Sequence, residues 1–481
     1  MTGKLPVFFC CLLLLGTARS QVPAIGGRLR VAVERLEKDS SMRHAIISLC
    51  VREAGTNRVI FERNAQVGVA PASCQKLLTS VAALDLLGPD YRYRTRVGYR
   101  GTVTDGALNG DLYIAGSGDP TLGSWRWDST KEEVVLGRWV RMVQLAGIKS
   151  YTGTIILDDR TWGTDAVPGG WIWEDIGNYY GAGAWGLDWR ENQYDVRLQA
   201  GESVGDPVKI TNLADLVKRE MPVWINELTT GPAGSGDNSY IYQPPYGEFA
   251  ILRGTAPLQK EETVISGSLP HPARHVALLW KDALKKAGII RAGDKFTSGG
   301  IRAELALEPA DSTIHPDNWI GESVSPALDS INYWFLRRSI NLYGEALVKT
   351  LALEKKGVVS TEGGVGVVKD FWAGHGIDRA ALHILDGSGL SPQNRVTTDA
   401  LVKVLQYART RPWFKAFYNS LPMFNGMHMK SGSIGGARSF SGYQTGADGK
   451  EYVFSIIVNN YDGSSGEAVK KLYGILDNLK K

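Results

Sequence analysis

The sequence predicts an α+β fold, in which an antiparallel sheet layered by helices is interrupted by a large inserted region of one or two small domains. Strand patterns occur near both ends of the chain, whereas the stretch from about residue 91 to about residue 315 has a different residue pattern. The 481 residues amount to about three times the usual domain length of roughly 150. We therefore expect residues 21–92 and 316–481 to form one domain, with residues 93–315 inserted into it.

Near the N-terminus, a predicted hairpin precedes a predicted buried helix. Ala45–Glu53 is rich in strand-forming residues, Gly55-Thr56-Asn57 is a turn, and Val59–Phe61 returns as a second strand. Lys76–Leu87 is apolar on nearly every face and ends before Gly88-Pro89. Because a helix that is apolar all round is buried, we expect this helix inside the domain.

The remaining elements follow from the same patterns. The C-terminal strands would join the N-terminal hairpin in one sheet, with helices layered on it. In the insertion we expect strands at Gly110–Ala115, Thr152–Asp158 and Asn192–Leu198, and helices at Leu136–Leu145 and Val276–Ala287. After it we expect helices at Ser325–Glu354, Thr398–Tyr407 and Ser465–Leu479, and strands at Met427–Ser433, Phe440–Thr445 and Tyr452–Asn459.

The composition is that of an ordinary soluble globular protein. Hydrophobic residues make up 43% of the chain and charged residues 22%. A net charge of +4 is too small and too dispersed to indicate nucleic acid binding. The 14 Trp and 19 Tyr have rings that can stack on sugars or peptides, but we assign them first to the core.

The first 20 residues have the layout of a secretory signal peptide. Lys4 supplies the positive start, residues 6–15 are apolar, and Ala18-Arg19-Ser20 offers a cleavage site before Gln21. A buried N-terminal helix is the alternative. No lipobox-like pattern precedes Cys10 or Cys11, and no second long apolar stretch follows. We therefore expect secretion across the inner membrane to the periplasm or cell-wall space, with no transmembrane segment in the mature chain.

Two cysteines, Cys50 and Cys74, remain after cleavage. They can pair in an exported protein, but we favour two buried free thiols, since one lies in a strand and the other beside the candidate nucleophile. His271 and His275 are separated by Pro272 and so do not share a clean helix face. We expect no metal and no cofactor.

Ser73 and Lys76 are the first candidate catalytic pair. Residues three apart on a helix lie on one face, and the start of a helix stabilises negative charge. A lysine desolvated by the apolar helix around it can be neutral enough to take the serine proton. A helix-capping serine with an exposed lysine is the alternative, and two later motifs argue against it.

The two later motifs supply an amide, a second amine and two hydroxyls. Ser339-Ile340-Asn341 offers a hydroxyl to relay a proton and an amide to hold a substrate amide. Lys430-Ser431-Gly432-Ser433 offers an amine and a hydroxyl for a carboxylate. Gly432 lets a substrate backbone approach closely. A further tight glycine loop runs from Asp386 to Ser391.

S-x-x-K, S-x-N and K-[ST]-G in this order are typical of penicillin-binding proteins and serine β-lactamases. The chain resembles the D-alanyl-D-alanine carboxypeptidase/endopeptidase family, the class C low-molecular-mass penicillin-binding proteins. The resemblance covers nearly the whole mature chain, and the long gap between Ser73 and Ser339 is similar to that family. It implies a penicillin-binding catalytic domain of residues 21–92 and 316–481. Further family-like stretches are 71–79, 111–113, 116–122, 179–182, 386–391 and 430–442.

The resemblance implies hydrolysis of D-alanyl-D-alanine-type bonds in peptidoglycan stem peptides through a Ser73 acyl-enzyme. It implies that Lys76 is the base, that Ser339 relays a proton near Lys430, and that Asn341 orients the acyl amide. Lys430 and Ser431 would hold the terminal carboxylate, and the N–H groups of Ser73 and Ser433 the oxyanion. β-Lactam antibiotics would be inhibitors that bind covalently.

Two substitutions depart from the commoner family motifs, and other functions remain open. Ile340 stands where many relatives have Asp, and Ser431 where Thr is commoner. The alternatives are a serine β-lactamase or S-x-x-K esterase, and a non-catalytic protein that binds the cell wall. The stretch Gly201-Glu202-Ser203-Val204-Gly205 also matches a hydrolase nucleophile elbow, but Asp206-Pro207 follows instead of a helix.

Overall fold

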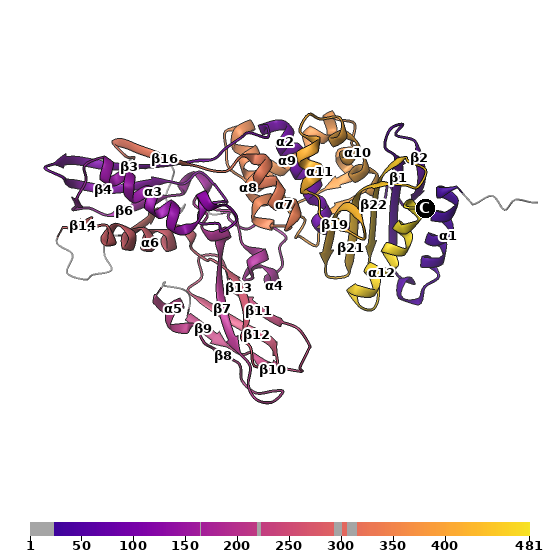
Figure 1. Cartoon of the computed structure of the whole chain (residues 1–481), viewed down its shortest axis with the longest axis horizontal. Helices are drawn as coiled ribbons and strands as arrows, with labels where there is room; N and C mark the ends of the chain where they lie inside the picture. Colours follow the sequence, from indigo (N-terminus) through magenta and orange to yellow (C-terminus); the bar gives the residue numbers. More distant parts are fainter. Residues whose placement is uncertain (1–23, 164, 219–222, 293–300, 305–314) are drawn as a thin grey trace, which may run out of the picture.

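The computed structural model describes residues 24–163, 165–218, 223–292, 301–304 and 315–481. The predicted signal peptide, residues 1–20, lies outside these ranges. No helix within the described ranges is long and apolar enough to span a lipid bilayer. The α+β prediction is confirmed, because antiparallel sheet and helices occur in layers (Figure 1).

The central element is a six-stranded antiparallel sheet in the order β19-β20-β21-β22-β1-β2. The N-terminal hairpin joins the C-terminal strands as predicted, because β1 pairs with β22 over its whole length. The strands are β1 (Ile46–Glu53), β2 (Val59–Arg63), β19 (Met423–Phe424), β20 (Met427–Ile434), β21 (Ala437–Thr445) and β22 (Glu451–Asn459).

Both faces of this sheet are covered, which explains its nearly continuous apolar strands. On one face Phe454 and Ile456 pack with residues of α1 (Ile25–Glu37) and α12 (Ser465–Leu476). On the other face Val453 and Ile457 belong to a large core that includes α2 (Lys76–Leu87). In Figure 1 the two groups of helices lie on opposite sides of the sheet.

Helix α2 runs through the middle of the second helical layer, and its first nine residues are all buried. It contacts α7 (Leu328–Arg337), α8 (Asn341–Lys356), α9 (Thr361–Gly374) and α10 (Thr398–Arg409), which explains why it is apolar on all faces. Helix α11 (Phe414–Ser420) packs against α7 in the same layer.

Several helical features differ from the sequence prediction. The stretch Ser325–Glu354 is two helices, broken where Ser339 adopts a φ of 57°. Helices α1, α9 and α11 were not predicted; α1 and α9 both have glycines in their first turn, and glycine disfavours helix. In α9 the glycine serves packing: a Cβ on Gly364 would lie 1.8 Å from the carbonyl oxygen of Val348.

A seven-stranded sheet with two helices packed on it comes mostly from the predicted insertion. Strand β16 belongs to this sheet although it follows residue 315, because it pairs with β3. The sheet consists of β3 (Arg94–Thr104), β4 (Ala107–Ala115), β5 (Ser150–Tyr151), β6 (Ile155–Asp158), β14 (Ile290–Arg291), β15 (Ile301–Glu304) and β16 (Asn318–Val324); the helices are α3 (Glu132–Leu145) and α6 (Pro272–Lys286).

Two smaller sheets share a separate core within the same region and project from the rest of the molecule (Figure 1). Gly201–Gly205 lies in a loop before one of these strands, and no helix follows it directly. The elements are α4 (Trp173–Ile176), β7 (Gln193–Gln199), β8 (Lys209–Ile210), α5 (Leu213–Lys218), β9 (Val223–Asn226), β10 (Thr229–Gly231), β11 (Asn238–Tyr242), β12 (Phe249–Pro257) and β13 (Thr263–Ser268).

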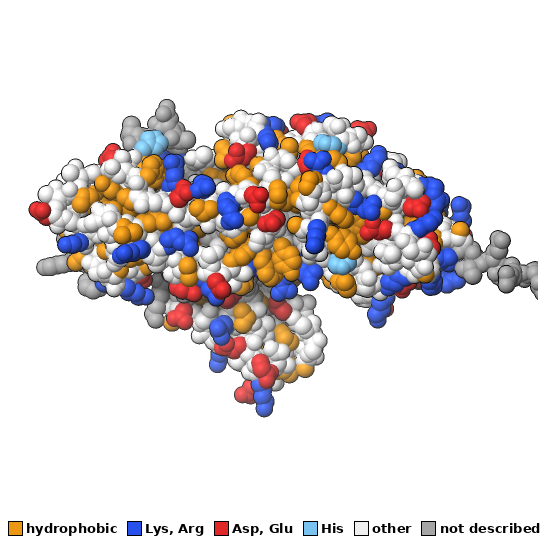
Figure 2. Space-filling model, turned by 45° about the horizontal axis from the view of Figure 1, so that its top comes forward, with side chains coloured by type: hydrophobic (Ala, Val, Ile, Leu, Met, Phe, Trp, Pro, Cys, Tyr) orange, Lys and Arg blue, Asp and Glu red, His pale blue; other side chains and the backbone are white. Residues whose placement is uncertain are grey.

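The division into residues 21–92 plus 316–481 and an insertion of residues 93–315 stays a prediction. Cys50 and Cys74 are both free and buried. Figure 2 shows Lys and Arg side chains interspersed with Asp and Glu over the face in view. The charge is therefore dispersed on this face, as its small net value suggested.

Candidate active site

Ser73 lies on a short 3-10 turn, Ala72–Gln75, which leads directly into α2. The preceding residue, Ala72, has a φ of 46°, which non-glycine residues rarely adopt. The turn brings the Ser73 hydroxyl within 3.0 Å of Lys76 Nζ. Ser73 was expected in the first turn of the helix itself, but the helix begins at Lys76.

Lys76 is fully buried, and three oxygen atoms surround its amine. Nζ lies 3.0 Å from Ser73 Oγ, 2.6 Å from Asn341 Oδ1 and 2.7 Å from the carbonyl oxygen of Ser388. A charged ammonium would donate to all three. A neutral amine would donate to the amide and carbonyl oxygens, which only accept, and its lone pair would face the Ser73 hydroxyl proton.

The pKa of Lys76 is held well below its ordinary value. Burial is the main cause, because it penalises the charged form, and the nearby charge of Lys430 adds to it. Asp386 and Glu345 act in the opposite direction, as negative neighbours do. Since burial prevails, the lysine is poised to accept a proton.

Asn341 is the first residue of α8, and its amide links two parts of the molecule. Oδ1 accepts from Lys76, and Nδ2 donates to the carbonyl oxygen of Tyr180 at 2.7 Å. An amide nitrogen carries two hydrogens, so one remains for a ligand. Ser339 precedes this helix, and no hydrogen bond of its hydroxyl occurs within the described ranges; it lines the same cavity as Ser73.

Lys430 lies on β20, where it is buried, and its pKa is lowered to about 8 by that burial. Its Nζ donates to the carbonyl oxygen of Ser431 at 2.7 Å. Gly432 follows, and a Cβ there would lie 2.9 Å from the backbone nitrogen of Ser73 and 2.6 Å from the carbonyl oxygen of Pro71. Only glycine lets β20 approach the Ser73 turn this closely.

The edge of β20 facing the cavity is open. Strand β19 pairs with β20 at Met427 and His428, and from Lys430 onward no described strand pairs with β20 on that side. Ser431 and Ser433 both line the cavity beside this edge. An extended peptide can therefore add to the sheet here through backbone hydrogen bonds.

The cavity has a volume of about 1210 Å³ and is lined from both sides. One wall consists of the residues described above, whereas the other comes from the predicted insertion. The insertion contributes Trp125, Arg126, Ile172, Asp175, Tyr179, Tyr180, Glu191, Gln193 and Tyr240. The insertion therefore forms part of the cavity wall.

All eight residues predicted from the sequence gather around this cavity. Six of them line it, Lys76 is buried behind Ser73, and Gly432 packs against the Ser73 turn. Glu345 and Trp171 were not predicted as site residues, and Tyr180 and Asp386 stood only within the family-like stretches 179–182 and 386–391, with no role. The carboxylate of Asp386 accepts five hydrogen bonds.

Glu345 is a second buried group near the site whose pKa differs from its value in solution. It is fully buried on α8, and its Oε2 accepts from the backbone N–H of Gly387 at 3.0 Å. Burial and the neighbouring charge of Asp386 raise its pKa to about 8. This carboxyl therefore holds its proton to a higher pH than an exposed glutamate does.

Comparison with known proteins places this architecture in one family. The chain is 28% identical over 95% of its length to a D-alanyl-D-alanine carboxypeptidase of an Actinomadura species, covering 86% of that protein. It is 22% identical to a D-alanyl-D-alanine carboxypeptidase of Haemophilus influenzae, with 88% and 87% of the two chains covered.

The fold is that of a penicillin-binding protein. The crystal structure of penicillin binding protein 4 from Haemophilus influenzae matches with a TM-score of 0.77 at 19% identity, covering 94% of this chain and 99% of the other. The family model for D-Ala-D-Ala carboxypeptidase 3 matches residues 29–478. The chain therefore belongs to the D-Ala-D-Ala carboxypeptidase 3 (S13) family.

Proposed function

We propose that this serine-type D-Ala-D-Ala peptidase hydrolyses peptidoglycan stem peptides through an acyl-enzyme on Ser73. The observation that carries the proposal is the pair formed by Ser73 Oγ and Lys76 Nζ, 3.0 Å apart. The amine is buried and its pKa is lowered, so it can be neutral when the serine needs a base. No cofactor is required for this chemistry.

In the first step Ser73 Oγ attacks the carbonyl carbon of the penultimate D-alanine while its proton moves to Lys76 Nζ. The C–N bond then breaks, and the leaving amine takes a proton relayed by the hydroxyl of Ser339. In the second step water attacks the ester, releases the acyl peptide and restores the Ser73 hydroxyl. A general base of this kind contributes about 10²–10⁴-fold.

The open edge of β20 supports the binding mode. The backbone N–H groups of Ser73 and Ser433 would hold the developing oxyanion. Lys430 and Ser431 would hold the terminal carboxylate, and the remaining amide hydrogen of Asn341 would orient the acyl amide of the substrate. Lys430 is buried, so its charge acts through a medium of low effective dielectric constant.

The size of the cavity supports peptide substrates larger than a terminal dipeptide. We propose that the enzyme removes terminal D-alanine, cuts cross-links between stem peptides, or does both. A related Haemophilus influenzae structure, with a TM-score of 0.71 and 18% identity, is complexed with a β-lactam. We expect β-lactams to acylate Ser73 here as well, and we propose the periplasm or cell-wall space as the location.

Labelled penicillin tests the proposal directly. The wild-type chain should carry a long-lived covalent label, and Ser73→Ala should carry none. Ser203→Ala is the matched control, because this exposed serine lies in the loop that resembles a nucleophile elbow; it should label as the wild type does. Label that persists in Ser73→Ala would refute the assignment.

A second measurement separates the rival functions. The protein is incubated with a defined cross-linked muropeptide, and the products are weighed by mass spectrometry. Loss of one D-alanine indicates carboxypeptidase activity, whereas two separated stem peptides indicate endopeptidase activity. Rapid turnover of penicillin without an adduct would instead favour a β-lactamase, and binding without any product would favour a wall-binding protein.

A further inference from the structure

One segment of the predicted insertion, residues 165–184, is hydrogen-bonded to helix α8 at two points. Asn341 and Lys349 lie eight residues apart, on the same face of this helix. Asn341 Nδ2 donates to the carbonyl oxygen of Tyr180 at 2.7 Å. Lys349 Nζ, which is buried, donates to the carbonyl oxygen of Ala184 at 2.8 Å and to that of Asp165.

The same segment makes two further hydrogen bonds to the glycine loop Asp386–Ser391. The indole N–H of Trp171 donates to Asp386 Oδ2 at 2.9 Å. The hydroxyl of Ser391 donates to the carbonyl oxygen of Gly170 at 2.9 Å. Both Trp171 and Asp386 are buried, so these bonds are shielded from water, where they would be weaker.

Asp386 determines the shape of this loop. Its carboxylate accepts the backbone N–H groups of Gly389 at 2.8 Å and Ser391 at 2.7 Å. It also accepts the side-chain amides of Gln75 at 2.8 Å and Asn394 at 2.9 Å. The indole of Trp171 is the fifth donor and the only one that comes from the segment 165–184.

The loop in turn contacts the amine of Lys76. Ser388 lies two residues after Asp386, and its carbonyl oxygen accepts from Lys76 Nζ at 2.7 Å. Gly389 is pressed against the Ser73 turn, since a Cβ there would lie 2.1 Å from the carbonyl oxygen of Ala72. A chain of contacts therefore runs from Trp171 through Asp386 and Ser388 to Lys76.

We propose that Trp171 is a positioning residue for Lys76, which acts through Asp386 and the loop that carries Ser388. The insertion would then contribute to the reactivity of the base as well as to the cavity wall. This inference rests on the proposed role of Lys76 in acylating Ser73. It concerns a residue that touches neither the nucleophile nor the cavity.

The expected consequence is electrostatic. The charged and titratable groups that face Lys76 are Lys430 on β20, Asp386 in the loop, Glu345 on α8 and Cys74 on the Ser73 turn. Without the indole N–H, Asp386 Oδ2 keeps only the donor from Ser391, and its negative charge is less well compensated. The protonated form of Lys76 gains stability, so the pKa of Lys76 rises. The acid limb of the pH–rate profile, in which the acylation rate increases as Lys76 loses its proton, therefore moves to higher pH.

The test is the acylation rate with labelled penicillin, measured from pH 5 to pH 9 in Trp171→Phe. Phenylalanine keeps an aromatic ring but lacks the N–H. On the acid side of the profile, where the rate rises with pH, we expect acylation about tenfold slower than wild type, as for the loss of one hydrogen bond to a charged group. The deficit should shrink as the pH rises, because Lys76 becomes neutral in both proteins.

Trp173→Phe is the matched control. Trp173 lies two residues further along, is 45% exposed and has its ring centroid 6.0 Å from that of Tyr242. Its rate should equal the wild-type rate at every pH. Replacement of Trp171 by 3-benzothienyl-L-alanine removes the N–H and keeps the two-ring shape, so it should reproduce the shifted acid limb even where phenylalanine disturbs folding.

Each remaining outcome contradicts the proposal. A Trp171→Phe profile identical to wild type would show that the indole N–H does not influence the base. A rate lowered equally at every pH, together with a lower Tm, would indicate a structural role alone. A wild-type protein that takes no label would overturn the role of Ser73 and Lys76 together with this inference, and is thereby distinguishable from the first two results.

Discussion

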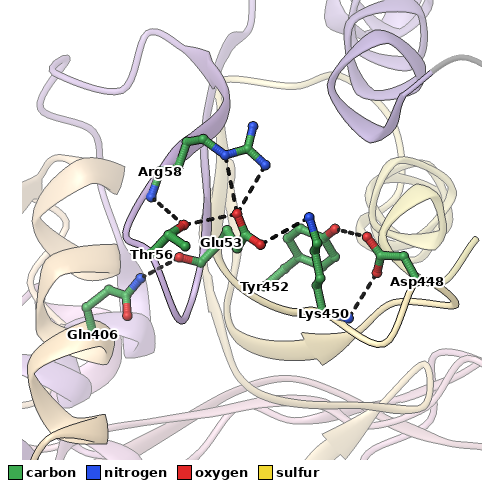
Figure 3. Close-up of polar contacts among 7 residues, drawn as sticks. All are labelled: Glu53, Thr56, Arg58, Gln406, Asp448, Lys450 and Tyr452. Atoms are coloured by element: carbon green, nitrogen blue, oxygen red, sulfur yellow. Dashed lines mark hydrogen bonds and ion pairs between the residues drawn. The ribbon is translucent and has the colours of Figure 1, made fainter.

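Two polar clusters in the same domain contain similar residues and differ in their access to water. The cluster around Glu53 joins the turn after β1 to the turn before β22 (Figure 3). Glu53 accepts from Thr56 at 2.9 Å and Arg58 at 3.1 Å, and forms an ion pair with Lys450 at 3.3 Å. Arg58 is 61% exposed and Lys450 48% exposed, so both cations keep water around them.

Their pKa shifts run in opposite directions. The hydrogen bond from Thr56, followed by those from the cations, lowers the pKa of Glu53, so this carboxylate is more firmly charged than in solution. Around Lys76, burial lowers the pKa of the lysine and raises that of Glu345 to about 8. Burial, rather than residue type, therefore separates a reactive polar cluster from a structural one.

The largest expected effect comes from exchanging one lysine in each cluster for methionine. Lys76→Met should slow acylation by penicillin about 10²–10⁴-fold, because a general base is lost while the side-chain volume is kept. Lys450→Met should leave the rate unchanged, because the side chain of this lysine is half-exposed and pairs with Glu53, away from the site. Stopped-flow or gel measurement of penicillin labelling checks both variants. Equal acylation rates in the two would contradict the distinction between the buried and the exposed cluster.

A second effect is expected in the pH dependence of acylation. Lys430 has a pKa of about 8, so it loses its positive charge as the pH rises through that value. Binding of the substrate or penicillin carboxylate should weaken above it, with rates falling by about tenfold per pH unit. Lys430→Met should be acylated slowly at all pH values, and its rate should not fall further above pH 8. A fall that persists in the variant would show that a group other than Lys430 causes it.

A third effect concerns stability. Because the pKa of Glu345 in the folded chain is about 8, against an ordinary value of 4.5, the folded state holds a proton that the unfolded state has lost. Stability should therefore fall as the pH rises from 4.5 to about 8, by at most about 1.4 kcal/mol per pH unit. In Glu345→Gln this decline should be smaller, as thermal unfolding from pH 5 to pH 9 would show; parallel Tm profiles of the two proteins would contradict it.

Much of the fold could be predicted from local patterns. The strands near both ends of the chain either alternate between apolar and polar residues or are continuously apolar, and α2 is apolar on every face. The central sheet and its buried helix can therefore be predicted from the periodicity of apolar residues. The break between α7 and α8 could not be predicted, because it depends on Ser339 adopting a positive φ. Helix α9 was missed because its glycines serve packing against α8 rather than helix formation.

In the candidate site, too, some residues could be predicted from local sequence patterns and others could not. Ser73, Lys76 and Lys430 carry their chemistry in their own side chains, so short motifs revealed them. Tyr180 contributes a backbone carbonyl, which any residue possesses and no motif can encode. Trp171 is 215 residues from Asp386 in the chain, and nothing local in the sequence indicates that the two meet.

The smallest expected effect belongs to the exposed cluster. Glu53→Gln keeps the acceptor for Thr56 but loses the charge that attracts Arg58 and Lys450. We expect a Tm lower by a few degrees at most, since ion pairs with exposed partners contribute little, and an acylation rate equal to wild type. Because the pKa of Glu53 is lowered in the folded chain, its stabilisation is present near neutral pH and is lost as the pH falls through that lowered value. The difference in Tm should therefore vanish in acid and shrink in 1 M salt; a difference that grows in acid would mean that Glu53 stabilises the turns by something other than its charge.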